Sequence, residues 1–474
     1  MKLQLYLFLI LLYGITTILR VLPEGFHPDS LVYMSMARNL AEGHYGFWHL
    51  HFTDNLFNTF YEHPPLGIYL MSLGFTLFGD TLLVDKFFGP FFGILIFFEV
   101  VLIFRLLYPK NYKNSVLLAG FYFLAFPIVS NTLESNLLEI PAAFFALGSV
   151  YIFLKGVKEE KNDFVYAFFF TLVLLLAFLS KGPVAIFPFA LPFFYFLLFS
   201  HSFSFIKMFR YYLFSLFFIA IYTLALYLYE PSHHYFSVYF QHQIMDSLSG
   251  TRGGGEHFKL LGQLLVDTSS IIIISFIIFV VARVKPLGLE LSKFFWLFLL
   301  IGLSGSIPLE LSPKQHDYYI FPAIIYFSIA FAILFVNPMQ QALKKFGGQK
   351  LFRVLNILLL LSFIVFGWEQ SHSCKRHKNF YHDFIDAKIV LEKNADINIC
   401  TSNAKDKREF FNNTEITGNL ERYYQVRLWD NNNSMSKYYL TTMPSQKDCK
   451  IDAKKYKYIG AEKVNYYLLY ERKD

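Results

Sequence analysis

Residues 164–180 read FVYAFFFTLVLLLAFLS and continue directly into Lys181-Gly182-Pro183. The first segment has no charged side chain, and an α-helix needs about 20 mostly apolar residues to cross a bilayer. Ten further segments share this character. The eleven candidate spans are 3–21, 84–107, 114–131, 138–154, 164–180, 183–199, 211–229, 264–282, 294–310, 319–336 and 354–368. We therefore expect a polytopic α-helical membrane protein with about eleven transmembrane helices.

The composition supports this class. Of the 474 residues, 55% are hydrophobic and only 16% are charged, whereas soluble domains carry about 25% charged residues. The chain also contains 58 Phe and 32 Tyr. So much apolar surface excludes a soluble enzyme, a disordered chain, a fibrous repeat and a nucleic-acid-binding protein as the basic class.

The apolar composition ends near residue 370, and only four of the Phe residues follow that point. We predict a transmembrane domain at 1–369, with long outer loops at 22–66 and 230–262, and a soluble domain at 370–474. Runs at 388–391, 438–442 and 464–470 fit helix or strand pieces of a small α/β domain.

Charge indicates the orientation. With the N-terminus in the cytoplasm, the inner segments hold more than twice as many Lys and Arg residues as the outer segments before residue 370. An odd number of spans then places the C-terminal domain outside the cytoplasm, as in a multi-pass protein of a bacterial inner (plasma) membrane. Cys374, Cys400 and Cys449 all lie in this domain. An oxidising compartment would allow a Cys400–Cys449 disulfide; the alternative is three unpaired cysteines.

The unusual polar residues fall on the outer side under this topology. In the first loop, Asp29 precedes an amphipathic segment that ends near Gly43. It fits an N-cap, and it also fits a carboxylate held at the membrane surface as a general base. Further along, Glu62 and His63 precede Pro64-Pro65, which fixes the backbone at the rim of an apolar segment.

Two glutamates lie close together near the end of the third span. Glu134 is expected to be solvated. Glu139 adjoins the start of an apolar helix and is the better candidate for a site residue, although a carboxylate at a helix N-terminus is also favourable on its own.

Lys181 lies in a tight turn between two apolar segments, where it could bind a phosphate or a lipid headgroup, or simply snorkel. The second long loop holds His242, Arg252 and His257 around a run of glycines. There Arg252 could bind phosphate and a histidine could bind metal, or the histidines could be ordinary surface residues. The last outer turn contains Lys314 and Tyr319.

In this order the motifs resemble membrane glycosyltransferases of the GT-C fold, in the branch of the lipid A aminoarabinose transferases and protein O-mannosyltransferases. The resemblance covers most of the membrane domain. It rests on Asp29, on Glu62-His63-Pro64-Pro65, on Lys181-Gly182-Pro183, on Arg252 and His257, and on Lys314 with Tyr319 and Pro322. His63 stands where the family often has lysine, and Asp29 is not followed by a second acidic residue.

The resemblance implies transfer of a sugar from a polyprenyl-phosphate donor to an extracytoplasmic acceptor, which could be lipid A or another glycolipid, a polysaccharide or a protein. Asp29 would be the general base. The donor phosphate would contact Lys181, Arg252, Lys314 and His63, and the substrate would contact Glu139 and Tyr319. A divalent metal (Zn, or Mg or Mn) would be held by Glu62 and His257, with His242 as the second choice.

A different class stays open at this point. A transporter or lipid flippase with an outer accessory domain would also be polytopic and carry a soluble tail. Transporters place polar groups near the membrane midplane, whereas the span centres here are mostly Phe, Leu and Ile. Membrane lipids are expected partners in either case.

Overall fold

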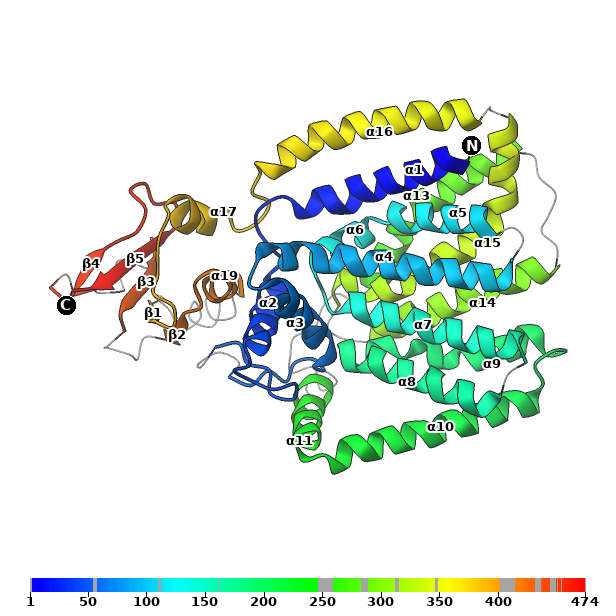
Figure 1. Ribbon diagram of the computed structural model, residues 1–474, viewed down its shortest axis with the longest axis horizontal. Helices are drawn as coiled ribbons and strands as arrows, with labels where there is room; N and C mark the ends of the chain where they lie inside the picture. The colour runs from blue at the N-terminus through cyan, green and yellow to red at the C-terminus, as the bar shows by residue number, and fades with distance from the viewer. Residues whose placement is uncertain are drawn as a thin grey trace. The chain divides into compact units, whose positions relative to one another are not determined.

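The structure is a computed structural model. It describes residues 2–53, 58–109, 112–160, 162–245, 259–282, 289–311, 315–345, 348–400, 414–430, 436–443, 449, 451–452 and 454–473. Figure 1 shows helices through most of the chain and strands only near its C-terminus.

Within these ranges, nine helices are long and apolar enough to cross a membrane. Eight of them coincide with or overlap α4 (Leu82–Leu107), α7 (Glu139–Lys158), α8 (Asp163–Lys181), α10 (Phe205–Leu228), α13 (Lys259–Ala282), α14 (Leu289–Ser306), α15 (Phe321–Lys345) and α16 (Gly348–Ser371). The ninth joins α1 (Lys2–Tyr13) to the short π-helix η1 (Gly14–Ile18) and the 3₁₀-helix η2 (Leu19–Val21). A tenth span is a bent pair, α5 (Tyr112–Ala125) and α6 (Pro127–Glu134), with an angle of 76° between them. Pro127 begins α6, and its missing N–H explains a break at this point.

The expected span at 183–199 is not one long helix. It consists of the short 3₁₀-helices η3 (Pro183–Ala185) and η4 (Phe187–Ala190) followed by the short α-helix α9 (Leu191–Phe199). It nevertheless runs the length of α8, because Arg210 Nε in α10 donates to Asp163 Oδ2, at the start of α8, over 3.0 Å. A 19-residue helix is about 28 Å long, so the chain between Lys181 and α10 must return over that distance. The prolines divide the segment into short helices, but the segment still runs from one end of the bundle to the other.

By its internal contacts the chain divides into two compact units. The first contains Met1–Val21, Tyr61–Gly67 and Lys86–Trp368, and we call it the bundle unit. The second contains Leu22–Phe60, Ile68–Asp85 and Glu369–Asp474, and we call it the loop-tail unit. The expected membrane and soluble domains at 1–369 and 370–474 stay a prediction, since the two units are defined by contacts and not by a bilayer.

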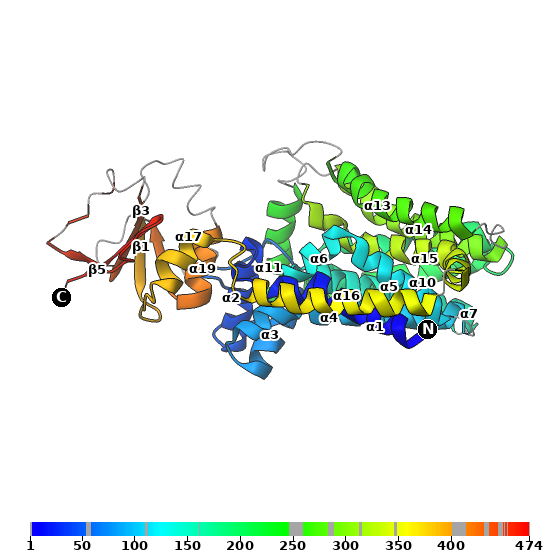
Figure 2. The same ribbon diagram turned by 90° about the horizontal axis from the view of Figure 1, so that it is seen from above.

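In the bundle unit, α1 and α16 run side by side although they are far apart in sequence (Figures 1 and 2). Asn356 Nδ2 donates to the Gln4 carbonyl oxygen over 2.8 Å. A Cβ on Gly14 would lie 2.8 Å from the Phe363 ring. A small residue and a buried amide thus join the two helices, as is common between helices in membranes.

Small residues also bring α7 and α8 together. Ala142 and Ala146 of α7, Ala177 of α8 and Ala185 of η3 form one fully buried cluster. The two helices are consecutive and antiparallel (Figure 1). The first residue of α7, Glu139, therefore lies at the same end of the bundle as the last residue of α8, Lys181. The other elements of this unit are α11 (Glu230–Tyr239), η5 (Phe240–Met245), η6 (Ile307–Leu311) and η7 (Asp317–Ile320).

The loop-tail unit is built around a five-stranded sheet in the order β2-β1-β3-β5-β4. β1 (Asp396–Cys400) pairs in parallel with β2 (Arg427–Asp430) and β3 (Tyr438–Thr442), while β5 (Tyr467–Arg472) pairs antiparallel with β3 and with β4 (Tyr456–Tyr458). The helical elements of the unit are α2 (Pro28–Ala41), most of α3 (Leu66–Phe78), α17 (Lys378–Phe380), η8 (Tyr381–Asp386) and α19 (Thr414–Tyr424). The small α/β domain is confirmed, and β3 covers the expected run at 438–442. The run at 388–391 forms neither helix nor strand.

Within this unit, α19 packs against α2. A Cβ on Gly418 would lie 2.8 Å from Leu31 Cβ, so glycine permits the close approach. Arg38 of α2 is almost fully buried and donates to the Glu421 carboxylate and carbonyl oxygens over 2.7 and 3.0 Å. Packing and charge together hold the first loop and the tail in one unit.

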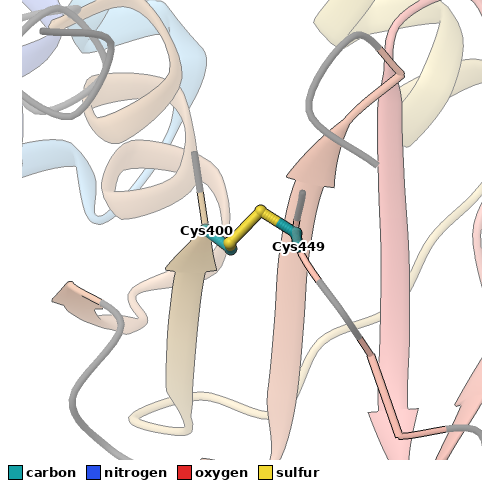
Figure 3. The surroundings of a disulfide bond; sticks show 2 residues. All are labelled: Cys400 and Cys449. Atoms are coloured by element: carbon teal, nitrogen blue, oxygen red, sulfur yellow. A yellow bond between two sulfur atoms is a disulfide. The ribbon is translucent and has the colours of Figure 1, made fainter. Parts of the chain in front are cut away.

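Cys400, at the end of β1, forms a disulfide with Cys449, with a Cα–Cα distance of 6.0 Å (Figure 3). Cys374 is a free thiol. The pairing expected as one of two alternatives is therefore the one present.

Candidate active site

The Lys181-Gly182-Pro183 motif forms the end of α8 and the turn that follows it. Gly182 caps the helix with φ of +93° and ψ of −154°, a conformation that is essentially restricted to glycine. A Cβ at this position would also lie 2.3 Å from Tyr239 Oη. Glycine is thus required twice, by backbone conformation and by space.

Lys181 forms a buried ion pair with Glu139. Its Nζ lies 3.0 Å from Glu139 Oε1, and the two side chains are 5% and 0% exposed. Glu139 begins α7 and Lys181 ends α8, so each charge also has the sign that its helix terminus favours. The sequence predicted both residues as site residues, and the structure brings them into contact.

Two more predicted residues surround the same ammonium group. Lys181 Nζ lies 3.4 Å from His63 Nε2 and 5.6 Å from the centre of the Tyr319 ring. The ring is close enough for a cation–π interaction. Four residues separated by up to 256 positions therefore form one cluster, which we call the Lys181 cluster: His63, Glu139, Lys181 and Tyr319.

The segment that carries His63 is held against the bundle. A Cβ on Gly67 would lie 2.7 Å from Leu138 Cδ2 and 3.1 Å from the Ser180 carbonyl oxygen, so this segment approaches both α7 and α8 closely. The Tyr235 hydroxyl donates to the His63 carbonyl oxygen over 2.6 Å. Burial raises the pKa of Tyr235 well above its usual range, and the neighbouring Tyr239, Tyr61 and Glu62 add to the shift. Tyr235 therefore stays a hydrogen-bond donor at neutral pH.

Glu62 points to a different partner. One of its carboxylate oxygens accepts a hydrogen bond from the Gln243 side-chain amide. The described part of the chain holds no group of three or more His, Cys, Asp or Glu side chains arranged to bind one metal ion. His257, the second predicted ligand, lies outside the described residues, and His242 is exposed in η5. The donors that the structure describes do not fit a metal, and we derive no step through one.

Asp29 belongs to the loop-tail unit and lies in the first turn of α2. The expectation that it caps this helix is wrong: His27 is the N-cap, and its Nδ1 accepts from the Asp29 backbone N–H over 3.3 Å. The helix ends at Ala41, close to the predicted end. Because the cap is His27, the Asp29 side chain is not needed for capping.

Two further phosphate contacts predicted from sequence, Arg252 and Lys314, lie outside the described residues. Glu134 corrects another expectation. It is buried, not solvated, and Arg20 Nε donates to its Oε2 over 2.7 Å. Sequence reasoning also missed Tyr235 and Gln243, because no motif or spacing links them to residues 62 and 63, which lie more than 170 positions earlier.

The comparisons with known proteins agree with this architecture. Residues 62–227 match the family model of the dolichyl-phosphate-mannose-protein mannosyltransferases. The crystal structure of ArnT from Cupriavidus metallidurans bound to undecaprenyl phosphate is similar with a TM-score of 0.66 at 13% identity, covering 99% of this chain and 97% of that chain. The apo form of ArnT gives a TM-score of 0.62 at 12% identity, over 97% and 96% of the two chains.

A third likeness is to the Archaeoglobus fulgidus oligosaccharyltransferase in complex with Zn and sulfate, with a TM-score of 0.47 at 14% identity over 92% of this chain and 68% of that chain. No curated protein sequence matches the chain.

The match of residues 62–227 to the mannosyltransferase model and the ArnT-like fold of the whole chain confirm the resemblance to membrane glycosyltransferases of the GT-C fold that the motifs indicated. The match to the mannosyltransferase model spans the segment that contains Glu62, His63, Glu139 and Lys181. Three of the four members of the Lys181 cluster therefore lie in the matched segment.

Proposed function

We propose that this protein transfers a sugar from a polyprenyl-phosphate donor to an acceptor on the extracytoplasmic side of the membrane. The donor class is supported by the description of the matching family and by the undecaprenyl phosphate bound to ArnT. The observation that carries the proposal is the buried Lys181 at the end of a membrane-spanning helix, with His63, Glu139 and Tyr319 around its ammonium group.

The reaction is an exchange of bonds at the anomeric carbon. The acceptor hydroxyl oxygen forms a bond to C1 of the sugar while the bond from C1 to the phosphate oxygen breaks, and the anomeric configuration inverts. The electron pair of the broken bond goes to the lipid phosphate, whose negative charge increases. The proton of the acceptor hydroxyl goes to a general base.

Lys181 would stabilise the charge that develops on the departing phosphate. A cation acts strongly in this way when it is held in place in a site shielded from water, and the Lys181 side chain is only 5% exposed. Glu139 would position Lys181 before the donor arrives. His63, Arg252 and Lys314 would supply further phosphate contacts, and Tyr319 would contact the substrate.

Asp29 is our proposed general base. The proposal rests on the motif order, and it fits a half-buried carboxylate whose helix is already capped by another residue. Loss of a general base slows a reaction by about 10²–10⁴-fold. Asp29→Asn should therefore abolish measurable transfer without loss of folded protein.

The side of the membrane is part of the proposal. A disulfide between Cys400 and Cys449 is typical of an oxidising compartment, and the distribution of Lys and Arg predicts the same side for the C-terminal domain. Lipid A, another glycolipid, a polysaccharide or a protein could each be the acceptor in that compartment.

The test uses a deletion strain complemented with the wild-type gene, with Asp29→Asn, or with Glu24→Gln as a control carboxylate in the same loop. Envelope lipids, polysaccharides and proteins are compared by mass spectrometry. We expect a sugar modification that the wild type and Glu24→Gln restore and Asp29→Asn does not. Full modification by Asp29→Asn would remove Asp29 as the base.

A second measurement tests the donor separately. Binding of undecaprenyl phosphate to the purified full-length protein is compared between the wild type and Lys181→Met. Equal affinity in the two proteins would remove Lys181 from the donor site.

A further inference from the structure

A second candidate binding site lies entirely within the loop-tail unit. A cavity of about 410 Å³ is lined by the end of α2, by the chain that follows it up to Thr53, by Lys393 and Asn394, and by the end of α19 with the start of β2. This volume falls within the range of about 300–1,000 Å³ that is usual for small-molecule sites. None of the residues of the Lys181 cluster lines it.

Most of the buried residues of the cavity wall are polar, and several of them are held in place by hydrogen bonds. Arg38 donates to Asn39 Oδ1 and to Glu421, and Asn39 Nδ2 donates to the His51 and Phe52 carbonyl oxygens, each over 3.1 Å. These bonds fix the loop after α2 against α19. The wall is therefore formed before any guest enters.

Two buried groups of this wall are not satisfied by the described residues. Within those residues, Arg38 Nε and Thr53 Oγ1 have no hydrogen-bond partner, although the two side chains are only 1% and 3% exposed. Buried polar groups without partners are costly and are rare in folded proteins. Arg38 and Thr53 both line the cavity, and a small shift of either side chain would bring its unpartnered atom to a guest with hydroxyl groups.

The half-buried Tyr45 adds a flat aromatic surface to the wall. The Tyr45 ring stacks on the His51 ring with centroids 4.0 Å apart and an angle of 17°, and it lies parallel to His49 at 5.5 Å. Stacking fixes the plane of the Tyr45 ring. A fixed aromatic plane beside polar groups suits a ligand with both an apolar face and hydroxyl groups.

The partly exposed charged residues that line the cavity are already in ion pairs. Lys393 Nζ lies 3.6 Å from Glu42 Oε1, and Arg427 Nε lies 2.9 Å from Asp396 Oδ1. Arg38 is paired with Glu421 in the wall. An anionic ligand would have to displace these carboxylates, whereas an uncharged ligand rich in hydroxyl groups can bind donors and acceptors together.

From these features we propose that the cavity between the first loop and α19 binds an uncharged saccharide. Its ring would lie against Tyr45, and its hydroxyl groups would bond to the polar wall formed by Arg38, Asn39, Thr53 and Gln425. The site would hold a glycan portion of the acceptor or of the product, apart from the residues proposed for transfer. The proposal does not depend on the transfer reaction, because binding is measured without a donor.

The test is saturation-transfer NMR on the full-length protein in detergent. The probes are methyl α-mannopyranoside, methyl β-glucopyranoside and N-acetylglucosamine, with inorganic phosphate as an anionic competitor. We expect at least one of the sugars to bind and phosphate not to displace it. Binding of none of the sugars, or displacement of the bound sugar by phosphate, would overturn the proposal.

Substitutions test whether the sugar binds in this cavity. Tyr45→Ala should weaken sugar affinity at least about tenfold, and Thr53→Val, which removes one hydroxyl, about two- to tenfold. Tyr458→Ala removes a comparable half-exposed tyrosine that does not line the cavity, and it should change affinity less than about twofold.

The Lys181→Met and Glu139→Leu double variant separates this site from the proposed donor site, because both residues lie in the other unit and neither is left as an unpaired buried charge. It should leave the sugar signal intact even where it lowers affinity for undecaprenyl phosphate. If Tyr45→Ala and Thr53→Val bind as the wild type does, or if this double variant alone loses the signal, the saccharide site is not in this cavity.

Discussion

Lys181 Nζ lies 3.0 Å from Glu139 Oε1 in an ion pair that is almost completely shielded from solvent. A buried pair of this kind adds little net stability compared with apolar side chains of similar size, but removing one partner leaves an uncompensated charge and costs about 3–5 kcal/mol. The pair is therefore informative, because its contribution to stability can be separated from its contribution to activity.

Single and double substitutions of Lys181 and Glu139 separate the effect of the ion pair on stability from its effect on activity. We expect Lys181→Met and Glu139→Leu each to lower the stability of the purified protein by about 3–5 kcal/mol. The double variant should regain most of the loss, since it contains neither charge, and it should remain inactive because the proposed phosphate contact is missing. Thermal unfolding in detergent and the envelope modification assay are the two measurements.

Arg20 and Glu134 provide the matched control, because they form another ion pair of the bundle unit and are outside the proposed chemistry. A double Arg20→Met and Glu134→Leu variant should fold and retain activity. Full activity in the Lys181→Met and Glu139→Leu double variant would show that the pair is purely structural.

Gly182 offers a second prediction. Gly182→Ala places a Cβ within 2.3 Å of Tyr239 Oη and forces alanine to adopt φ of +93°. We expect strongly reduced activity and a destabilisation of more than about 1–3 kcal/mol, the usual cost of a strained backbone conformation alone. The same assays apply.

Adding Tyr239→Phe removes the hydroxyl that clashes but leaves the backbone strain. The double variant should recover part of the stability. Complete recovery would mean that space and not backbone conformation makes glycine necessary at position 182.

Much of the bundle could be read from the sequence, because a bilayer requires long apolar segments and these are visible directly. The segment 183–199 shows what the apolar pattern does not predict. Its prolines shorten the helices, and only the contact between Arg210 and Asp163 shows that the segment still returns along α8. Length and hydropathy alone did not describe this geometry.

The candidate site was predictable where a motif marks it. Lys181-Gly182-Pro183 and Glu62-His63-Pro64-Pro65 can be recognised in the sequence because they contain proline or glycine, which favour turns. Tyr235 was not predictable, since its contact to the His63 carbonyl oxygen depends on how α11 packs. Glu134 appeared to be a solvated residue because its partner, Arg20, lies 114 positions away.

Arg422 gives a third prediction, within the loop-tail unit. It donates to Asp85 and to Asp80, each over 2.7 Å, and its guanidinium lies 5.2 Å from the centre of the Phe75 ring. The Asp85 side chain is 1% exposed and the Asp80 side chain is 37% exposed. Arg422→Met should therefore destabilise this unit by about 3–5 kcal/mol, because Asp85 would be left buried without its partner.

The two carboxylates should not be equivalent. Asp80→Asn should have a small effect, since exposed ion pairs contribute about 0–1 kcal/mol, while Asp85→Asn should have a larger one. Limited proteolysis of the full-length protein, with cleavage mapped to α19, measures both. Equal effects of the two substitutions would contradict this ranking.

Asp383 gives a fourth prediction, which concerns pH. Burial by itself would raise the pKa of this carboxyl group, but the backbone N–H groups of Tyr467, Asn465 and Tyr466 and the side chain of His382 outweigh it and lower the pKa. The three backbone bonds are 2.7–2.8 Å long. A group whose pKa is lower in the folded state stabilises the fold above its unfolded pKa of about 3.9, and this contribution is lost as pH falls through the lower folded value.

The segment from Asn465 to Tyr467 leads into β5, so its amide protection reports on the Asp383 carboxylate. In hydrogen exchange of the full-length protein, corrected for the intrinsic rate at each pH, we expect protection to be constant near neutrality and to fall below about pH 4. Asp383→Asn should lower protection at neutral pH, because hydrogen bonds to a charged group are worth about 1.5–3 kcal/mol, and it should flatten the pH dependence. An unchanged acid profile in Asp383→Asn would show that a different group controls this segment.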